Sequence, residues 1–191
     1  MALRVVTALM VAMPLALPLV EAQSWKNTAP ESFRANGQIT STAGGVASQI
    51  DIQVDRYTSD QDHAALVKAL GSGYAPFVET LRKAPQIGTV KLGANAYAIR
   101  WARQRPQDSD HRRVAVVTDK PVFFAGAGAV DAKPTAGFDL ALVEFTIDSV
   151  GLGKGTMAPA ARVKAGGPTG IEIEDYSGKL ITLSTVTRNL K

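Results

Sequence analysis

The chain has 191 residues, no cysteine and a formal net charge of +4 at pH 7. The lack of cysteine excludes disulfides, a thiol nucleophile, an iron–sulfur cluster and a cysteine-ligated zinc site. The mild positive charge, with no long block of lysine or arginine, argues against a nucleic-acid-binding protein.

The N-terminus has the pattern of an export signal. Arg4 precedes an almost unbroken apolar run from Val5 to Val20, and Ala22 supplies a small residue at the expected cleavage position. A membrane anchor is the alternative, but the run is shorter than about 18 residues and contains two prolines. We therefore expect a signal peptide over 1–22, and a mature protein that is periplasmic or secreted. No second apolar stretch is long enough to span a membrane, so we expect the mature chain to be soluble.

The start of the mature chain predicts a flexible lead-in over 23–31, followed by one β-rich domain over 32–191. Strands are predicted over 32–42 and 46–58, and in the second of them Ile50, Ile52 and Val54 alternate with polar residues. The intervening Ala43-Gly44-Gly45 favours a hairpin connection. Together these segments predict a sheet surface with one buried and one solvated face.

The hydrophobic period then changes to that of a helix pair. Ser59 is a candidate N-cap, and Asp62 follows it at the spacing of a capping box. Gly71-Ser72-Gly73 separates two apolar stripes of helical spacing, and Pro85 ends the second. These features predict an αα-hairpin at about 60–84.

From Gly88 onward the pattern is mainly that of β-strands. We expect strands over 88–92, 95–105, 112–118, 138–148, 155–164, 170–175 and 180–187, and a long loop over 121–137. Because strands and helices do not alternate, a doubly wound parallel sheet is disfavoured. The expected class is α+β: mainly antiparallel β, a barrel or a sandwich of about eight or nine strands, with the αα-hairpin inserted.

Several familiar chemistries lack their motifs. His63 and His111 are the only histidines and no H-E-x-x-H occurs, so no zinc site is expected. Asp108-x-Asp110 lacks the remaining spacing of an EF-hand. The stretch GLGKGT at 151–156 fails as a phosphate loop because glycine follows its lysine, and it is interpreted as a glycine-rich hairpin turn. We expect no metal and no cofactor.

One carboxylate is a candidate catalytic residue. Glu144 lies within FDLALVEFTID, in which apolar residues occupy both faces of the expected strand. This pattern indicates burial on both faces or a bulge near the middle. Glu144 is then either partly buried with a basic partner or solvated where its face ends. A buried glutamate could have a raised pKa and act as an acid or base.

A basic hairpin supplies the candidate ligand-binding residues. Strict alternation would place Tyr97, Ile99, Trp101, Arg103 and Arg105 on one side of their strand, and Arg112 and Arg113 open the next strand. Arginines beside an aromatic ring often bind carboxylate, phosphate or sugar anions. The alternative is a solvated hairpin with weak cross-strand ion pairs. His63, on the apolar stripe of the first helix, is expected to pack against the sheet.

Five segments resemble, in their linear order, a group of exported bacterial proteins of unassigned function. They are the helix pair ending in LRKAPQIGTVKL, then YAIRWARQ, then RRVAVVTDKP, then FDLALVEFTID before GKGT, and finally IEIEDYSGKLITLSTV. The resemblance covers roughly residues 58–187 and implies an exported, single-domain, β-rich protein with a helical insert. It implies no reaction or ligand, so no functional residue is carried over. The stretch AGAGAVDAKPTAG departs from the more aromatic and polar segment expected there.

These observations favour an exported soluble protein that acts as a non-catalytic binding or envelope-associated module. The alternative is a small exported hydrolase or isomerase that uses a carboxylate such as Glu144 as acid or base in a β-barrel pocket. The arginines suggest an anionic small molecule or a glycan as partner. Neither a nucleic acid partner nor a membrane span in the mature chain is expected.

Overall fold

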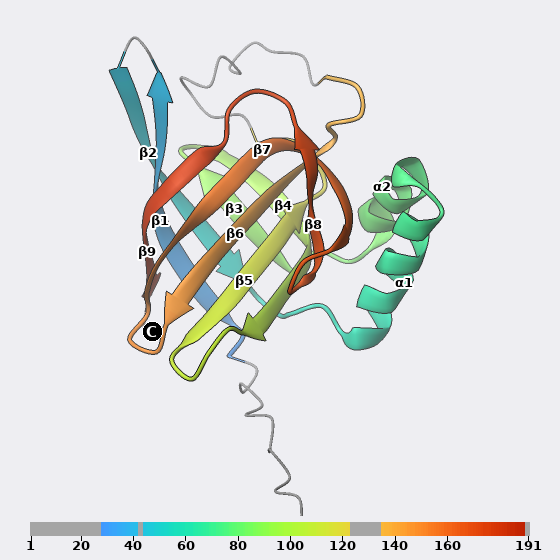
Figure 1. Cartoon of the computed structure of the whole chain (residues 1–191), viewed down its shortest axis with the longest axis horizontal. Helices are drawn as coiled ribbons and strands as arrows, with labels where there is room; N and C mark the ends of the chain where they lie inside the picture. The colour runs from blue at the N-terminus through green and yellow to red at the C-terminus, as the bar shows by residue number, and fades with distance from the viewer. Residues whose placement is uncertain (1–27, 42–43, 123–134, 190–191) are drawn as a thin grey trace, which may run out of the picture.

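The computed structural model describes residues 28–41, 44–122 and 135–189 (Figure 1). The expected signal peptide and most of the expected lead-in lie outside these residues, as does most of the loop expected over 121–137. In chain order the elements are β1 (Glu31–Ser41), β2 (Gly44–Val54), α1 (Asp60–Gly71), α2 (Tyr74–Lys83), β3 (Gly88–Leu92), β4 (Asn95–Pro106), β5 (His111–Thr118), β6 (Leu140–Asp148), β7 (Leu152–Gly166), β8 (Gly170–Tyr176) and β9 (Ile181–Asn189).

Eight of the strands close into an antiparallel barrel. The hydrogen-bonded order runs β1-β2-β3-β4-β5-β6-β7-β9 and returns to β1, while β8 extends the sheet from the far half of β7. The α1–α2 pair, inserted between β2 and β3, lies outside the barrel wall (Figure 1). The expected class of antiparallel β with an inserted αα-hairpin is therefore confirmed, and the closed ladder makes it a barrel. No helix in the described part of the chain is long and apolar enough to cross a membrane.

Two apolar clusters lie on opposite sides of the same wall. The cluster inside the barrel is built on side chains such as Phe33, Ile52 and Phe145, each exposed by 1% or less. The cluster outside it packs Phe77 and Leu81 of α2 against the outward faces of β4 to β8. The helix pair thus covers an apolar outer wall that would otherwise face water, which is a strong driving force for docking it.

Strand β6 serves both clusters. Val143 and Phe145 point into the barrel, while Leu140 and Leu142 point outward beneath the helices. This confirms the burial on both faces that the apolar pattern of FDLALVEFTID indicates. Glu144 shares the outward face with Leu142.

A bulge changes the face of β4 along its length. The ladder with β5 shifts register between Ile99 and Trp101, so that Tyr97 and Ile99 lie inside the barrel while Trp101 lies in the outer cluster. The prediction that these residues share one side was therefore wrong. A bulge inserts one residue opposite its partner strand and breaks the period of two.

The glycine-rich stretch 151–156 is mostly strand rather than turn, so that interpretation was also wrong. Only Gly151, with φ +93°, lies in the turn, and β7 already begins at Leu152. A Cβ at Gly155 would lie 2.1 Å from the Glu144 carbonyl oxygen and 2.5 Å from the Phe145 Cβ. Glycine is thus required by the close approach of β6 and β7 rather than by a reversal of the chain.

Candidate functional site

The helix pair begins and is separated as the sequence predicts. The Ser59 side chain caps α1 by accepting a hydrogen bond from the Asp62 backbone N–H at 3.1 Å. Gly73, with φ +127°, precedes α2 and permits the reversal between the helices. These local features place the two helices side by side, with their apolar face packed against the outer wall of the barrel.

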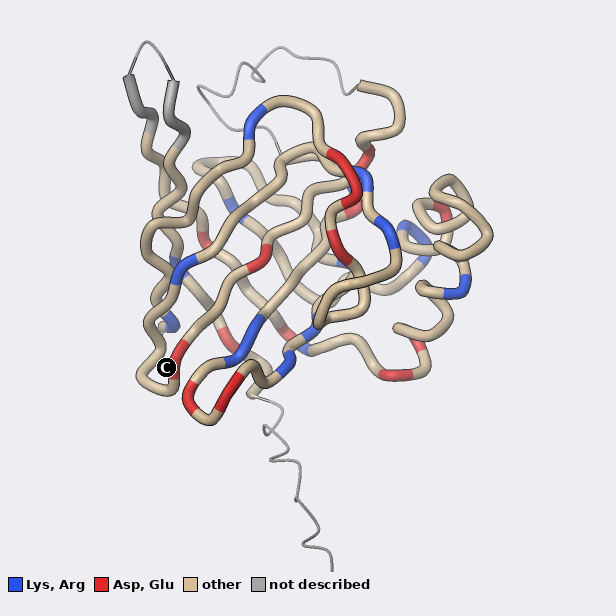
Figure 2. Tube along the Cα trace, viewed as in Figure 1, with Lys and Arg blue, Asp and Glu red and all other residues tan. Residues whose placement is uncertain are grey.

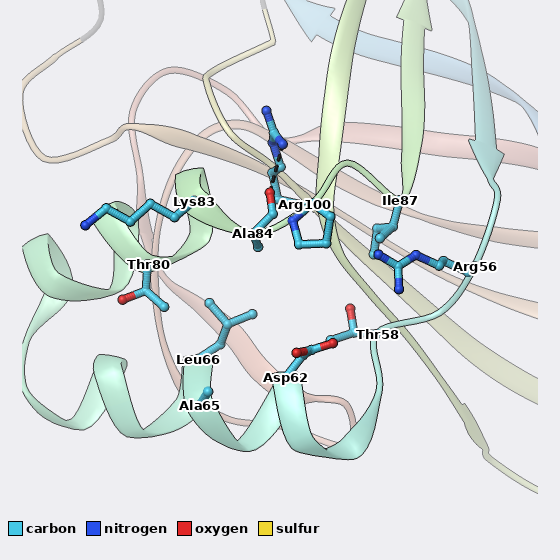
Figure 3. A pocket seen from close by; sticks show the side chains of 11 residues that line it. Arg56, Thr58, Asp62, Ala65, Leu66, Thr80, Lys83, Ala84, Ile87 and Arg100 are labelled. Atoms are coloured by element: carbon cyan, nitrogen blue, oxygen red, sulfur yellow. Dashed lines mark hydrogen bonds between the residues drawn. The ribbon is translucent and has the colours of Figure 1, made fainter.

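A cavity of about 220 Å³ opens between this helix pair and the barrel (Figure 3). Its apolar lining is Ala65, Leu66, Ala84, Pro85 and Ile87, and its polar lining is Arg56, Thr58, Asp62, Thr80, Lys83 and Arg100. The lining comes from three stretches: the segment from β2 into α1, the segment from α2 into β3, and one residue of β4. An apolar pocket with a few polar groups at its edge is the usual form of a small-molecule site.

Two of the three basic side chains in this lining already have acidic partners. Arg100 donates from Nε to the Asp119 carboxylate at 3.1 Å and from Nη1 to the Ala84 carbonyl at 2.8 Å, which ties the end of α2 to the wall. Lys83 pairs with Glu79 at 2.6 Å on the exposed side of α2. Arg100 therefore shapes the cavity, and Lys83 belongs to the helix surface.

The remaining charged groups of the lining are Arg56 and Asp62. Across the described residues, the Arg56 guanidinium has neither a hydrogen bond nor an ion pair. The Asp62 carboxylate accepts one hydrogen bond, from the Ser59 hydroxyl at 2.8 Å, and has no cationic partner in the same part of the chain. Figure 3 shows Arg56 and Asp62 toward one side of the pocket, with Lys83 at the other side. One positive and one negative group are thus left for a ligand.

A second hollow, of about 430 Å³, lies on the outer faces of β1, β2 and β9. Its lining is Asn36, Gln38, Ala47, Ser48, Gln49, Ser184 and Thr185. Its lining is mainly polar, with Ala47 as its one apolar residue, so a ligand would displace water from little apolar surface. This composition is typical of a solvated wall, and the helix–barrel cavity is the stronger candidate site.

The sequence-predicted catalytic candidate lies elsewhere. Glu144 is on the outer wall of the barrel, where its side chain is 28% exposed and pairs with Arg113 at 3.2 Å. It is absent from the lining of both hollows. This is the paired arrangement that the sequence left open for Glu144.

The predicted ligand-binding residues are divided between the two faces of the wall. Arg112 points into the barrel and is 2% exposed, whereas Arg103, Arg105 and Arg113 are on the outer side. Arg103 is buried and bonded to Asp60 at 2.8 Å. Trp101 is wholly buried beneath the helices. Acidic segments are interspersed with the basic ones along this wall (Figure 2), so the structure does not bring the five side chains into one site.

Arg112 instead belongs to a buried polar cluster at the end of the barrel that holds the β4–β5 turn. Its guanidinium donates to both oxygens of the Glu31 carboxylate, at 2.8 and 2.6 Å, and also to Tyr57 and Gln104. Glu31 is only 6% exposed and accepts a further hydrogen bond from the Tyr57 hydroxyl. Because its members bond to one another, the cluster is best explained as a structural plug of the barrel end.

The charges in this cluster shift one another's pKa values. Burial by itself raises the pKa of Glu31, but the hydrogen bonds from Arg112 and Tyr57 outweigh it and hold the pKa below 4.5. Burial and the neighbouring Glu31 carboxylate raise the pKa of Tyr57. The sequence analysis did not predict this cluster. A signal was present, because Glu31 and Arg112 each lie two residues before an inward-facing residue of the same strand, Phe33 and Val114 respectively.

His63 packs against the wall as expected from its place on the apolar stripe. Its Nδ1 accepts a hydrogen bond from the Trp101 indole N–H at 3.1 Å. Because an indole N–H can only donate, this contact requires a neutral imidazole with an unprotonated Nδ1. Burial, with a contribution from the nearby Arg103 and Arg105, lowers the pKa of His63 below 6.5.

This contact gives a pH dependence. The unfolded chain takes up a proton on its His63 at a higher pH than the folded protein does, so the His63–Trp101 contribution is complete above pH 6.5. It is lost as the pH falls through the lowered folded-state pKa. We expect the unfolding free energy of the wild type to decline more between pH 7.5 and 5 than that of His63→Gln, whose amide oxygen still accepts from Trp101. Denaturant titrations at several pH values measure this difference, and identical pH profiles for the two proteins would contradict it.

Over the described ranges, no group of three histidine, aspartate or glutamate side chains is placed to hold a metal ion. Comparison of the chain with protein families, with curated proteins and with solved structures found no match. The cavity chemistry is therefore the basis for the functional proposal.

Proposed function

We propose that this chain is an exported, non-catalytic binding module that holds a small amphipathic molecule in the helix–barrel cavity. The observation that carries the proposal is the combination of an apolar lining with two charged groups, Arg56 and Asp62, that have no oppositely charged partner within the described residues. Burial of an apolar ligand body stabilises a complex by about 25 cal/mol per Å², and the polar rim orients the ligand. Glu144 does not line this cavity, so the carboxylate-enzyme alternative gains no support from it.

Four probes that share one branched apolar body test the proposal. They are leucine, 4-methylpentanoate (leucine without its amine), 3-methylbutylamine (leucine without its carboxylate) and 3-methylbutanol. Saturation-transfer NMR on the mature protein is expected to show binding of at least one of them. Ala65→Trp is expected to abolish that binding, because the larger side chain enters the cavity that Ala65 lines.

A neighbouring position on the same helix supplies the control. Ala64 is exposed like Ala65 but does not line the cavity, so Ala64→Trp is expected to bind the probes as the wild type does. Thermal unfolding of both variants checks that the fold is retained. The proposal is wrong if none of the probes binds, or if Ala65→Trp binds them as well as Ala64→Trp does.

A further inference from the structure

We infer that the helix–barrel cavity selects a zwitterionic α-amino acid with an apolar side chain. The inference rests on the proposed function and names its ligand class. The cavity brings together a guanidinium at Arg56, a carboxylate at Asp62 and an apolar surface that includes Leu66 and Ile87. An α-amino acid carries the three matching groups: a carboxylate, an ammonium and an apolar body.

The size of the cavity favours a ligand of this class. A volume of about 220 Å³ lies below the roughly 300–1,000 Å³ of pockets that hold drug-sized ligands. A lipid or an oligosaccharide would extend well beyond it. A single amino acid fits, with its side chain against the apolar lining and its charged groups toward the open side.

The charges of Arg56 and Asp62 favour a zwitterion over a ligand that carries only one charged group. A monocarboxylate would pair with Arg56 but would bring a second negative charge into a small cavity that already holds Asp62. An amine would pair with Asp62 and be repelled by Arg56. A zwitterion meets both groups, and its carboxylate can accept two parallel hydrogen bonds from a guanidinium. Because Lys83 and Arg100 are engaged by Glu79 and Asp119, they do not disturb this balance.

Dissociation constants for leucine and its two single-head analogues test the inference. By calorimetry or NMR titration, we expect the wild type to bind leucine about tenfold or more tightly than 4-methylpentanoate or 3-methylbutylamine, which corresponds to about 1.4 kcal/mol. Arg56→Gln is expected to weaken leucine and 4-methylpentanoate but not the amine. Asp62→Asn is expected to weaken leucine and the amine but not the carboxylate.

Lys68→Gln provides the control for loss of a nearby positive charge, because Lys68 is an exposed residue of α1 that does not line the cavity. It is expected to leave all three constants unchanged. Equal affinity for leucine and 4-methylpentanoate, or equal effects of both charge variants on every probe, would overturn the amino-acid inference while leaving the cavity as a binding site. Failure of all the probes to bind the wild type would overturn both.

Discussion

Arg112→Leu is expected to lower the free energy of unfolding by about 3–5 kcal/mol, because it leaves a buried carboxylate without its cation. Arg112 is 2% exposed and Glu31 6% exposed, and two hydrogen bonds join them directly. Water cannot replace the lost guanidinium at such a site without opening the barrel end. Denaturant unfolding of the wild type and the variant at pH 7 measures the loss.

The double variant Glu31→Leu/Arg112→Leu is the matched control. Because it removes both charges, it is expected to recover most of the stability that Arg112→Leu loses. In the wild type, the folded-state pKa of Glu31 lies below 4.5. The ionised Glu31 therefore contributes fully to the free energy of unfolding above pH 4.5, and this contribution is lost as the pH falls through the folded-state pKa. A loss below about 1 kcal/mol for the single variant would show that the pair behaves like a surface ion pair.

Phe77→Ala is expected to destabilise the protein by about 3–5 kcal/mol and to abolish probe binding. Phe77 is wholly buried between α2 and the outer wall of the barrel, and its removal leaves a void where the helix pair docks. The helices would then no longer hold Thr80 and Ala84 in place as one side of the cavity. Unfolding titrations and NMR binding measurements on the same variant check both consequences.

Phe77→Leu keeps much of the apolar volume and is expected to cost less than Phe77→Ala and to retain binding. If Phe77→Ala bound the probes with unchanged affinity, the helix pair would not form a wall of the ligand site. A comparable loss of stability in both variants would mean that the shape of the ring, rather than apolar volume, anchors α2.

The strands and helices could be predicted because their signals are local. The alternation from Ile50 to Val54 and the Ser59 cap followed by helical spacing each depend on neighbouring residues. Barrel closure could not be predicted in this way, because it depends on β7 pairing with both β6 and β9. Pairing between strands that are distant in the sequence produces no repeating pattern of apolar and polar residues from which it could be predicted.

The candidate site shows the same division between local and non-local signals. The bulge between Ile99 and Trp101 moved the aromatic ring to the outer face and separated it from the inward Arg112. A pattern with a period of two cannot anticipate such an inserted residue. The cavity could not be predicted for another reason. Arg56 and Asp62 belong to no ligand-binding motif in the sequence, and both are exposed in the structure. Only the docking of the helix pair makes them face a shared apolar surface.

The most direct test of the helix–barrel cavity is an NMR titration of the ¹⁵N-labelled protein with leucine and its two single-head analogues, following every backbone amide. The expected result is a saturable set of shift changes concentrated in residues 56–66 and 80–87, the segments that line the cavity, together with Arg100. The absence of saturable changes with all three probes would contradict the account. So would changes centred on another wall, such as the polar hollow of β1, β2 and β9.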